Sequence, residues 1–230
     1  MARRGPLKDQ SLRLLRERGV EVGTILDVGV LNGTPELMSA WHDRKHILFE
    51  PVHEFSVVIG RKYHALDYEL HTVAVGEESG SVTLRIESNV EGMDISHSYM
   101  TPGAASDAPN RRSVPMVSLD DFLRDKSYSQ PYLLKIDIDG DELKVIKGAA
   151  ETLKKCSVVI VECPSHHLVA RISAVQAAGF SLFDLVEPCY YDGVFWQCDA
   201  IFVRNDILAD LFLQLKGAVV PGKYECFRLP

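Results

Sequence analysis

The sequence lacks a long apolar run: no stretch approaches the roughly 18 consecutive apolar residues that a membrane-spanning helix needs. Residues 1–19 are basic but contain no apolar core of the kind found in secretory signal peptides. The five cysteines are an odd number, and no two of them stand in a C-x-x-C spacing. This pattern disfavours a disulfide framework and a structural zinc site. We therefore expect a cytoplasmic protein with reduced thiols and no membrane partner.

Positive charge is also scarce, because 25 Lys and Arg residues stand against 32 Asp and Glu residues, and the formal net charge is −7. An acidic surface repels phosphate backbones, so a nucleic-acid partner is not expected. The apolar fraction is 46% over 230 residues, which suffices for a sizeable buried core. No repeat or linker divides the chain, and we expect one domain over residues 1–230.

Apolar runs alternate with helical segments along most of the chain, and the first helix lies within residues 1–22. Several runs are continuously apolar, as in strands that are buried on both faces of a parallel sheet. The predicted strands are 24–30, 46–49, 70–75, 133–138, 157–161, 180–185 and 200–203, and the predicted helices are 7–18, 35–41, 53–64, 141–155 and 167–178. The alternation predicts an α/β, doubly wound sheet with right-handed crossovers.

Two stretches break the alternation. Residues 76–86 have the pattern of a turn followed by an extra strand over 82–86. Residues 87–116 are rich in Ser, Gly, Pro, Asn and Asp and show no clear period. Because a loop of this length is usually functional or mobile, we predict an insertion loop that acts as a lid over the acceptor site. Within it, His97 is a candidate catalytic base or substrate contact.

The turn after the first predicted strand has the composition of a cofactor site. Gly29 permits a tight turn and close approach of a ligand, and Gly33 lets the next helix pack near the strand. The dinucleotide fingerprint G-x-G-x-x-G is not present, because Leu31 stands at its second glycine. The carboxylate of Asp27 would repel a pyrophosphate and attract a cationic ligand. These charges favour S-adenosylmethionine over NAD.

Glu50 follows Asp27 by 23 positions, at the end of the second predicted strand. An ionised carboxylate at such a position can accept hydrogen bonds from both hydroxyl groups of a ribose. Taken alone, each acid could equally be a solvent-exposed strand end. Two acids at successive strand ends, with a glycine turn after the first, favour cofactor binding. The candidate cofactor-binding residues are Asp27, Gly29, Asn32, Gly33, Glu50 and Pro51.

Four acids cluster near the end of the fourth predicted strand. Asp137 and Asp139 are two positions apart and would share a face, so they are candidate catalytic residues. Like charges this close raise one pKa or recruit a cation, and carboxylate oxygens suit Mg²⁺, which Asp137 and Asp139 could bind. Asp141 and Glu142 are expected to begin a helix, where acids complement the helix dipole. Lys135, in the same strand, is expected to pair with one of the acids.

The fifth predicted strand ends in Glu162, which could orient a base or bind substrate. His166 is a candidate general base, because histidine titrates near neutral pH. The alternative is a surface pair, formed with His167, at the start of a helix. Further along, Tyr191 would offer an aromatic face to a ring-shaped substrate. Trp196 is expected in the core.

Several of these segments resemble the FkbM-type family of S-adenosylmethionine-dependent methyltransferases, over about residues 24–205. The matching segments are 25–29 (ILDVG), 49–51 (FEP), 73–76 (VAVG) with 79–80 (SG), 117–123 (VSLDDFL), 133–143 (LLKIDIDGDEL), 147–149 (KGA), 161–162 (VE), and 191–193 (YDG) through 199–203 (DAIFV). The segment 134–149 is the most specific. Two motifs depart from the family: Val30-Leu31 stand where its turn usually reads Ala-Asn, and Asp139 stands where it often has Glu.

The resemblance implies a Rossmann-like, mostly parallel seven-stranded sheet with an antiparallel last strand, for which residues 200–203 are the candidate. It also implies O-methylation of a hydroxyl group on a small molecule, such as a sugar or a polyketide. An NAD-dependent oxidoreductase, a non-catalytic binding protein and a nucleic-acid methyltransferase are the alternatives. The identity of the acceptor, the metal requirement and a homodimer stay open.

Overall fold

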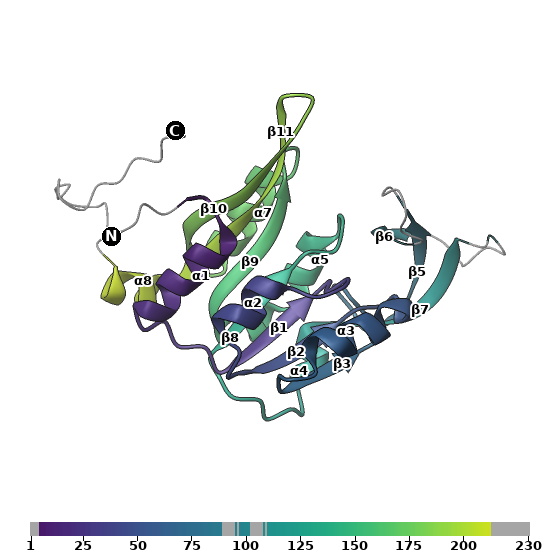
Figure 1. Cartoon of the computed structure of the whole chain (residues 1–230), viewed down its shortest axis with the longest axis horizontal. Coiled ribbons are helices and arrows are strands. Elements are labelled where there is room, and N and C mark those ends of the chain that lie inside the picture. Colours follow the sequence, from purple (N-terminus) through teal and green to yellow (C-terminus); the bar gives the residue numbers. More distant parts are fainter. Residues whose placement is uncertain (1–4, 89–94, 96, 102–107, 109, 213–230) are drawn as a thin grey trace.

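The computed structural model describes residues 5–88, 95, 97–101, 108 and 110–212. At its centre lies a seven-stranded sheet with the order β10-β11-β9-β8-β1-β2-β3 (Figure 1). Its strands are β1 (Thr24–Val28), β2 (Lys45–Phe49), β3 (Tyr68–His71), β8 (Tyr132–Ile136), β9 (Cys156–Pro164), β10 (Phe180–Tyr191) and β11 (Val194–Arg204). The strands from β9 to β3 are parallel, whereas β11 runs antiparallel to β9 and β10. The predicted doubly wound sheet with an antiparallel last strand is confirmed.

Helices cover both faces of this sheet. One face carries α1 (Lys8–Glu17), α2 (Pro35–Ala40), η1 (His53–Phe55), α3 (Ser56–Tyr63) and α8 (Asn205–Leu211); the other carries α4 (Leu119–Leu123), α5 (Glu142–Lys147), α6 (Ala150–Leu153) and α7 (Leu168–Ala177). Neighbouring residues of a strand serve different layers: Leu133 packs toward α1, and Leu134 packs toward α5. This explains why the central strands are mainly apolar and do not alternate between apolar and polar residues. Within the described residues, no helix is long and apolar enough to cross a membrane.

A second sheet stands beside the first and was not predicted. Its strands, in the order β4-β7-β5-β6, are β4 (Ala74–Val75), β5 (Gly80–Glu87), β6 (His97–Thr101) and β7 (Arg111–Val117). The extra strand predicted at 82–86 is part of β5. The strand predicted at 70–75 is divided, because its first half pairs with β2 and its second half with β7. The insertion predicted at 87–116 supplies β6 and β7, whose pairing with β5 no local sequence period reveals.

The helix predicted at 141–155 is interrupted, and its two halves are α5 and α6. The break lies at Gly148, where an added Cβ atom would stand 2.2 Å from the carbonyl oxygen of Gly76. The Gly148 carbonyl oxygen accepts a hydrogen bond from the backbone N–H of Asp120 (3.0 Å) instead of continuing a helix. Helix α4 was not predicted, because five residues are too few to show a helical period.

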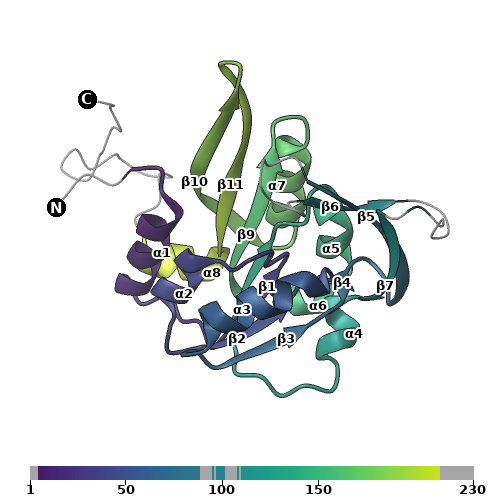
Figure 2. The same ribbon diagram turned by 45° about the vertical axis from the view of Figure 1, so that its right-hand side comes forward.

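Strands β10 and β11 continue beyond the predicted ranges 180–185 and 200–203 and leave the main sheet as a hairpin. Figure 2 shows this hairpin and the second sheet projecting on different sides of the central strands. A register irregularity follows Val186, and Glu187 has a left-handed φ of 52°. Because of this irregularity, apolar and polar residues do not alternate regularly along β10, and the sequence does not show where the strand ends. Near the tip of the hairpin, Tyr190, Tyr191 and Val194 are exposed. The prediction that Trp196 lies in the core is wrong, since it is 49% exposed.

Candidate functional site

A cavity of about 180 Å³ opens at the carboxyl ends of β1 and β2, where the second sheet meets the first. Its apolar wall consists of Val28, Leu31, Phe49, Pro51, Val73, Ala74, Val75, Leu84, Met100 and Ile138. Its polar side chains are Glu50, Ser98, Asp137 and Asp139, and no Lys or Arg of the described chain is among its lining residues. Such a cavity suits an apolar ring that carries hydroxyl or cationic groups, and it offers nothing to a phosphate.

The turn after β1 packs tightly against the end of β8. Gly29 has a φ of 81°, and its N–H donates a hydrogen bond to the Phe49 carbonyl oxygen (3.0 Å). An added Cβ atom at Gly29 would lie 1.7 Å from the carbonyl oxygen of Asp137. Leu31, at the position of the missing second glycine, also adopts a left-handed φ of 51°. This conformation costs a non-glycine residue roughly 1–2 kcal/mol.

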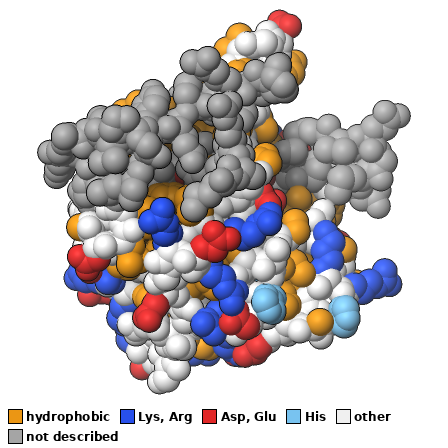
Figure 3. All heavy atoms as spheres, turned by 60° about the vertical axis from the view of Figure 1, so that its left-hand side comes forward, with side chains coloured by type: hydrophobic (Ala, Val, Ile, Leu, Met, Phe, Trp, Pro, Cys, Tyr) orange, Lys and Arg blue, Asp and Glu red, His pale blue; other side chains and the backbone are white. Residues whose placement is uncertain are grey.

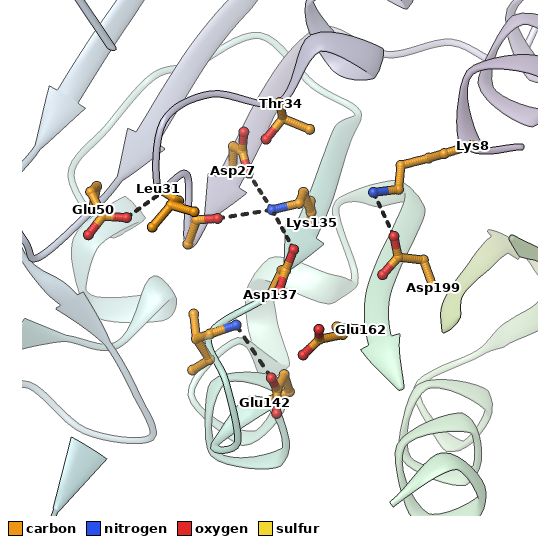
Figure 4. A network of polar contacts seen from close by, with 12 residues as sticks. Lys8, Asp27, Leu31, Thr34, Glu50, Lys135, Asp137, Glu142, Glu162 and Asp199 are labelled. Carbon is orange, nitrogen blue, oxygen red and sulfur yellow. Dashed lines mark hydrogen bonds and ion pairs between the residues drawn. The ribbon is translucent and has the colours of Figure 1, made fainter. Parts of the chain in front are cut away.

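Glu50 holds this strained turn in place. Its buried carboxylate accepts hydrogen bonds from the backbone N–H of Leu31 (2.7 Å) and of Val52 (2.9 Å), and Figure 4 shows it directed at Leu31. Burial raises the pKa of Glu50 to about 7, although both hydrogen bonds act to lower it. Each carboxylate oxygen keeps a further lone pair. Glu50 can therefore accept hydrogen bonds from a ligand in the cavity.

Asp27 does not line the cavity. It is fully buried, and its Oδ1 atom lies 3.3 Å from Nζ of Lys135. The same ammonium lies 3.3 Å from Oδ2 of Asp137 and donates a hydrogen bond to the Gly29 carbonyl oxygen (3.0 Å). Burial alone would lower the pKa of Lys135. The carboxylates of Asp27 and Asp137 more than offset this effect, so the pKa is raised overall and the lysine stays charged. The predicted pairing of Lys135 is confirmed, and Asp27 acts on the turn through this lysine.

Three carboxylates line up at the carboxyl edge of the sheet: Asp137 after β8, Glu162 on β9 and Asp199 on β11. We call these three residues the acid row. Glu162 and Asp199 are register partners on neighbouring strands (Figure 4). Glu162 is partly buried and accepts a hydrogen bond from Nε2 of Gln197 (2.8 Å). Burial first, and then the charge of Asp137, raise the pKa of Glu162 to about 8.

This raised pKa should make the protein less stable as the pH increases. Unfolded Glu162 loses its proton near pH 4.5 and folded Glu162 near pH 8, so its contribution to the unfolding free energy falls across that interval. Glu162→Gln removes the titrating group. The stability of the variant relative to the wild type should therefore rise by more than about 1.4 kcal/mol between pH 5 and pH 8, the equivalent of one pKa unit.

Urea unfolding at pH 5, 6.5 and 8 measures this difference. Glu78→Gln, at an exposed site outside the cavity, is the matched control and should differ from the wild type by the same amount at all three pH values. A constant difference for Glu162→Gln as well would contradict the raised pKa.

A buried ion pair that the sequence did not reveal supports the loop after β8. Glu142 is fully buried, accepts a hydrogen bond from the backbone N–H of Gly140 (3.1 Å) and forms an ion pair with Arg171. Arg171 also donates to the backbone oxygen of Glu162 (2.6 Å). Helix α5 begins at Glu142, as predicted. The pairing was not visible in the sequence, because Arg171 comes from a separate helix, α7.

The candidate metal ligands Asp137 and Asp139 both border the cavity. Asp139 adopts a left-handed φ of 59° in the loop that Glu142 supports. Over the described part of the chain, no group of three or more His, Cys, Asp or Glu side chains is placed to hold a metal ion. The Mg²⁺ site that the sequence suggested is therefore not supported.

The other candidate cofactor residues lie around the turn. Pro51 lines the cavity. The Oδ1 atom of Asn32 accepts a hydrogen bond from Nζ of Lys62 on α3 (3.0 Å), outside the cavity. An added Cβ atom at Gly33 would lie 3.1 Å from Cδ of the same lysine, so this glycine lets α3 approach the turn.

Two of the remaining candidates, His166 and Tyr191, are not among the residues that line the cavity. His166 is exposed, and its ring is tilted by 49° against the ring of His167, with 4.3 Å between the centroids. Tyr191 is 76% exposed on the β10–β11 hairpin. The backbone of His97, in β6, pairs with that of Glu87 in β5, whereas the side chain of His97 is outside the part of the chain that the structure describes. The roles predicted for these three residues stay predictions.

The family described as "Methyltransferase FkbM domain" matches residues 27–182. No curated protein matches the sequence at a significant level. Similar solved structures include an rRNA methylase from Streptococcus thermophilus (10% identity, 89% of this chain and 98% of that chain, TM-score 0.47). Another is magnesium protoporphyrin IX methyltransferase from Synechocystis PCC 6803 with bound SAM (8% identity, 86% and 78%, TM-score 0.46). At these identities the likeness concerns the fold alone.

Proposed function

Because the chain belongs to the FkbM family of methyltransferases, which matches residues 27–182, we propose that it methylates a hydroxyl group of a small molecule such as a sugar or a polyketide. Family and fold make the chain an S-adenosylmethionine-dependent methyltransferase. The hydroxyl acceptor is the new element. It rests on one observation: Glu162 is a partly buried carboxylate whose pKa is raised to about 8 by burial and by the charge of Asp137, which lines the cavity.

The cavity residues fit S-adenosylmethionine. Glu50 would accept hydrogen bonds from the ribose hydroxyl groups, and the apolar wall would enclose the adenine. Asp137 and Asp139 would face the cationic part of the cofactor. When bound, the cofactor supplies an electrophilic methyl group on a sulfonium. The absence of Lys and Arg from the described lining residues disfavours NAD, whose pyrophosphate needs positive partners or a glycine-rich turn.

Glu162 is the residue that we assign as proton acceptor. A hydroxyl group is a weak nucleophile until its proton is removed, and a base works best with a pKa near the working pH. In this scheme the acceptor oxygen gains the methyl group, its proton passes to Glu162, and S-adenosylhomocysteine leaves as a neutral thioether. Asp137, Asp139, His97 and His166 stay candidates for assisting this step, and Tyr191 for contacting the acceptor.

The surface charge favours a small acceptor over a nucleic acid. The net charge is −7, and no Lys or Arg of the described chain lines the cavity. The face in Figure 3 shows acidic and basic side chains interspersed rather than a continuous basic stripe among the described residues. RNA binding depends on Lys and Arg side chains that neutralise phosphates. On the face in Figure 3 such side chains stand among acidic ones, an arrangement that disfavours RNA binding.

Ligand binding and methyl transfer test the proposal together. S-adenosylmethionine and S-adenosylhomocysteine should raise the melting temperature, whereas NAD should not. Glu50→Gln should weaken S-adenosylmethionine binding at least tenfold, because a charge-assisted hydrogen bond contributes about 1.5–3 kcal/mol. Transfer of an isotope-labelled methyl group should occur to one or more members of a panel of sugars and polyketides, giving a base-stable methyl ether.

Glu78→Gln is the control variant for binding and should keep the wild-type affinity, since this acid is exposed and does not line the cavity. Stabilisation by NAD alone would overturn the cofactor assignment. Transfer to RNA or to protein nitrogen, with none to the hydroxyl panel, would overturn the acceptor assignment while leaving the cofactor site intact.

A further inference from the structure

Residues 6–11, which precede the segment that matches the family, are fastened to the β10–β11 hairpin. The Glu187 N–H donates to the Pro6 carbonyl oxygen (2.8 Å), and the Glu187 carboxylate accepts from the Lys8 N–H (2.8 Å). The Ser11 hydroxyl donates to Asp184 (2.5 Å). These contacts hold Glu187 in its left-handed conformation at the register irregularity of β10. They also fix the start of α1 above the carboxyl edge of the sheet.

From this position, Lys8 reaches the acid row. Its Nζ atom lies 2.6 Å from Oδ2 of Asp199, and both residues are 8% exposed. Figure 4 shows the lysine extending from α1 to Asp199, with Glu162 on the next strand. Burial alone would lower the pKa of Lys8. The carboxylate of Asp199 more than offsets this effect, so the pKa is raised overall and the ammonium stays charged. A buried cation thus stands at one end of the row, opposite Lys135 at the other end.

We propose that Lys8 is a positioning residue of the methyl-transfer site: it neutralises Asp199 and so sets the charge felt by Glu162. The inference rests on the proposed function for its catalytic meaning. It goes further in assigning a role to a segment that lies outside the family match, which begins at residue 27.

The charges around Glu162 come from several elements, and they define the direction of the effect. The charged groups around it are Asp137 and Asp139 after β8, Glu142 on α5, Asp199 on β11 and Arg171 on α7, and Gln197 on β11 donates a hydrogen bond to it. Lys135 lies between Asp27 and Asp137. Asp199 carries its own cation, Lys8, and its negative charge raises the pKa of Glu162. Removing Lys8 should strengthen this repulsion, and removing Asp199 should relieve it.

Titration of the carboxyl carbon of Glu162 by NMR tests the proposal on the full chain. Glu162→Gln identifies the resonance. In Lys8→Met the apparent pKa of Glu162 should rise by about one unit, and in Asp199→Asn it should fall by a similar amount, as expected for a charge removed at close range. Lys8→Arg should restore the wild-type titration. Lys154→Met, which removes an exposed lysine with an acidic partner of its own, should leave the titration unchanged.

General structural damage would move the titration in the same direction in both variants, and that result would overturn the proposal. So would a Glu162 titration in folded Lys8→Met that coincides with the wild type. If Lys8→Met does not fold, the double variant Lys8→Met/Asp199→Asn, which removes both charges, takes its place. The apparent pKa of Glu162 in the double variant should exceed its value in Asp199→Asn by much less than one unit. A full one-unit gap would mean that Lys8 acts on Glu162 without Asp199.

Because the titration needs neither cofactor nor acceptor, its outcome is separate from that of the methyl-transfer assay. Where transfer is observed, its pH profile should move with the Glu162 titration: to higher pH in Lys8→Met and to lower pH in Asp199→Asn. A profile that stays fixed in both variants while the titrations move would show that Glu162 is not the proton acceptor.

Discussion

Gly29→Ala should destabilise the folded protein by more than about 4 kcal/mol, a loss typical of severe backbone and packing defects. The new Cβ atom would lie 1.7 Å from the carbonyl oxygen of Asp137, and the backbone φ of 81° disfavours any side chain. Relief requires the turn and the end of β8 to separate. That movement would break the hydrogen bond from the Asp137 N–H to the Val28 carbonyl oxygen (3.0 Å). Urea unfolding followed by circular dichroism measures the loss.

Gly80→Ala is the matched control for this substitution. Gly80 begins β5, and an added Cβ atom there meets no atom within 4 Å. Its stability should stay within about 0.5 kcal/mol of the wild type. A Gly29→Ala variant with near-normal stability and normal S-adenosylmethionine affinity would show that the contact between the turn and β8 is looser than the structure indicates.

Lys135→Met should cost about 3–5 kcal/mol, the usual effect of removing one partner of a buried ion pair. The lysine side chain is 4% exposed and lies between Asp27 and Asp137. Without it, the fully buried carboxylate of Asp27 has no cation, and the Gly29 carbonyl oxygen loses its side-chain donor. The loss should be greatest at high pH, since protonation of the carboxylate at low pH removes the buried charge.

Two further variants separate charge from packing at this position. Lys135→Met/Asp27→Asn removes both charges and should recover much of the lost stability. Lys45→Met, on neighbouring β2, removes a more exposed lysine that pairs with Asp67 and Glu69, and it should cost less than about 1 kcal/mol. If the double variant were no more stable than Lys135→Met, the loss would arise from packing rather than from the unpaired charge.

Asp27→Ala should act differently from what the sequence alone suggests. From the sequence alone, a carboxylate at the end of the first strand would attract a cationic cofactor directly, and Asp27→Ala would abolish cofactor binding without unfolding the domain. The structure buries Asp27 beneath the turn and pairs it with Lys135. We now expect Asp27→Ala to reduce stability, and to affect the cofactor site only through the position of Gly29.

The pattern of apolar residues within short segments was enough to predict those strands whose burial can be recognised from the segment itself. Strands β1, β2, β8 and β9 are mainly apolar because both of their faces are buried, and this signal was sufficient to place them. The second sheet gave no such signal. Its strands pair segments that are far apart in the chain. The break between α5 and α6 is also a tertiary effect: the residues on both sides of Gly148 have a helical pattern, and the break is explained only by the close approach of the Gly76 backbone.

The sequence by itself determined the doubly wound sheet, the glycine turn after β1, Glu50 at the end of β2 and the resemblance to the methyltransferase family. Each of these depends on a few consecutive residues. Only the tertiary structure decided which acids face the cavity and which are neutralised, because the deciding partners come from distant segments: Lys135 for Asp27, and Lys8 for Asp199. A carboxylate's chemistry depends on its surroundings, and a sequence names the carboxylate without naming its neighbours.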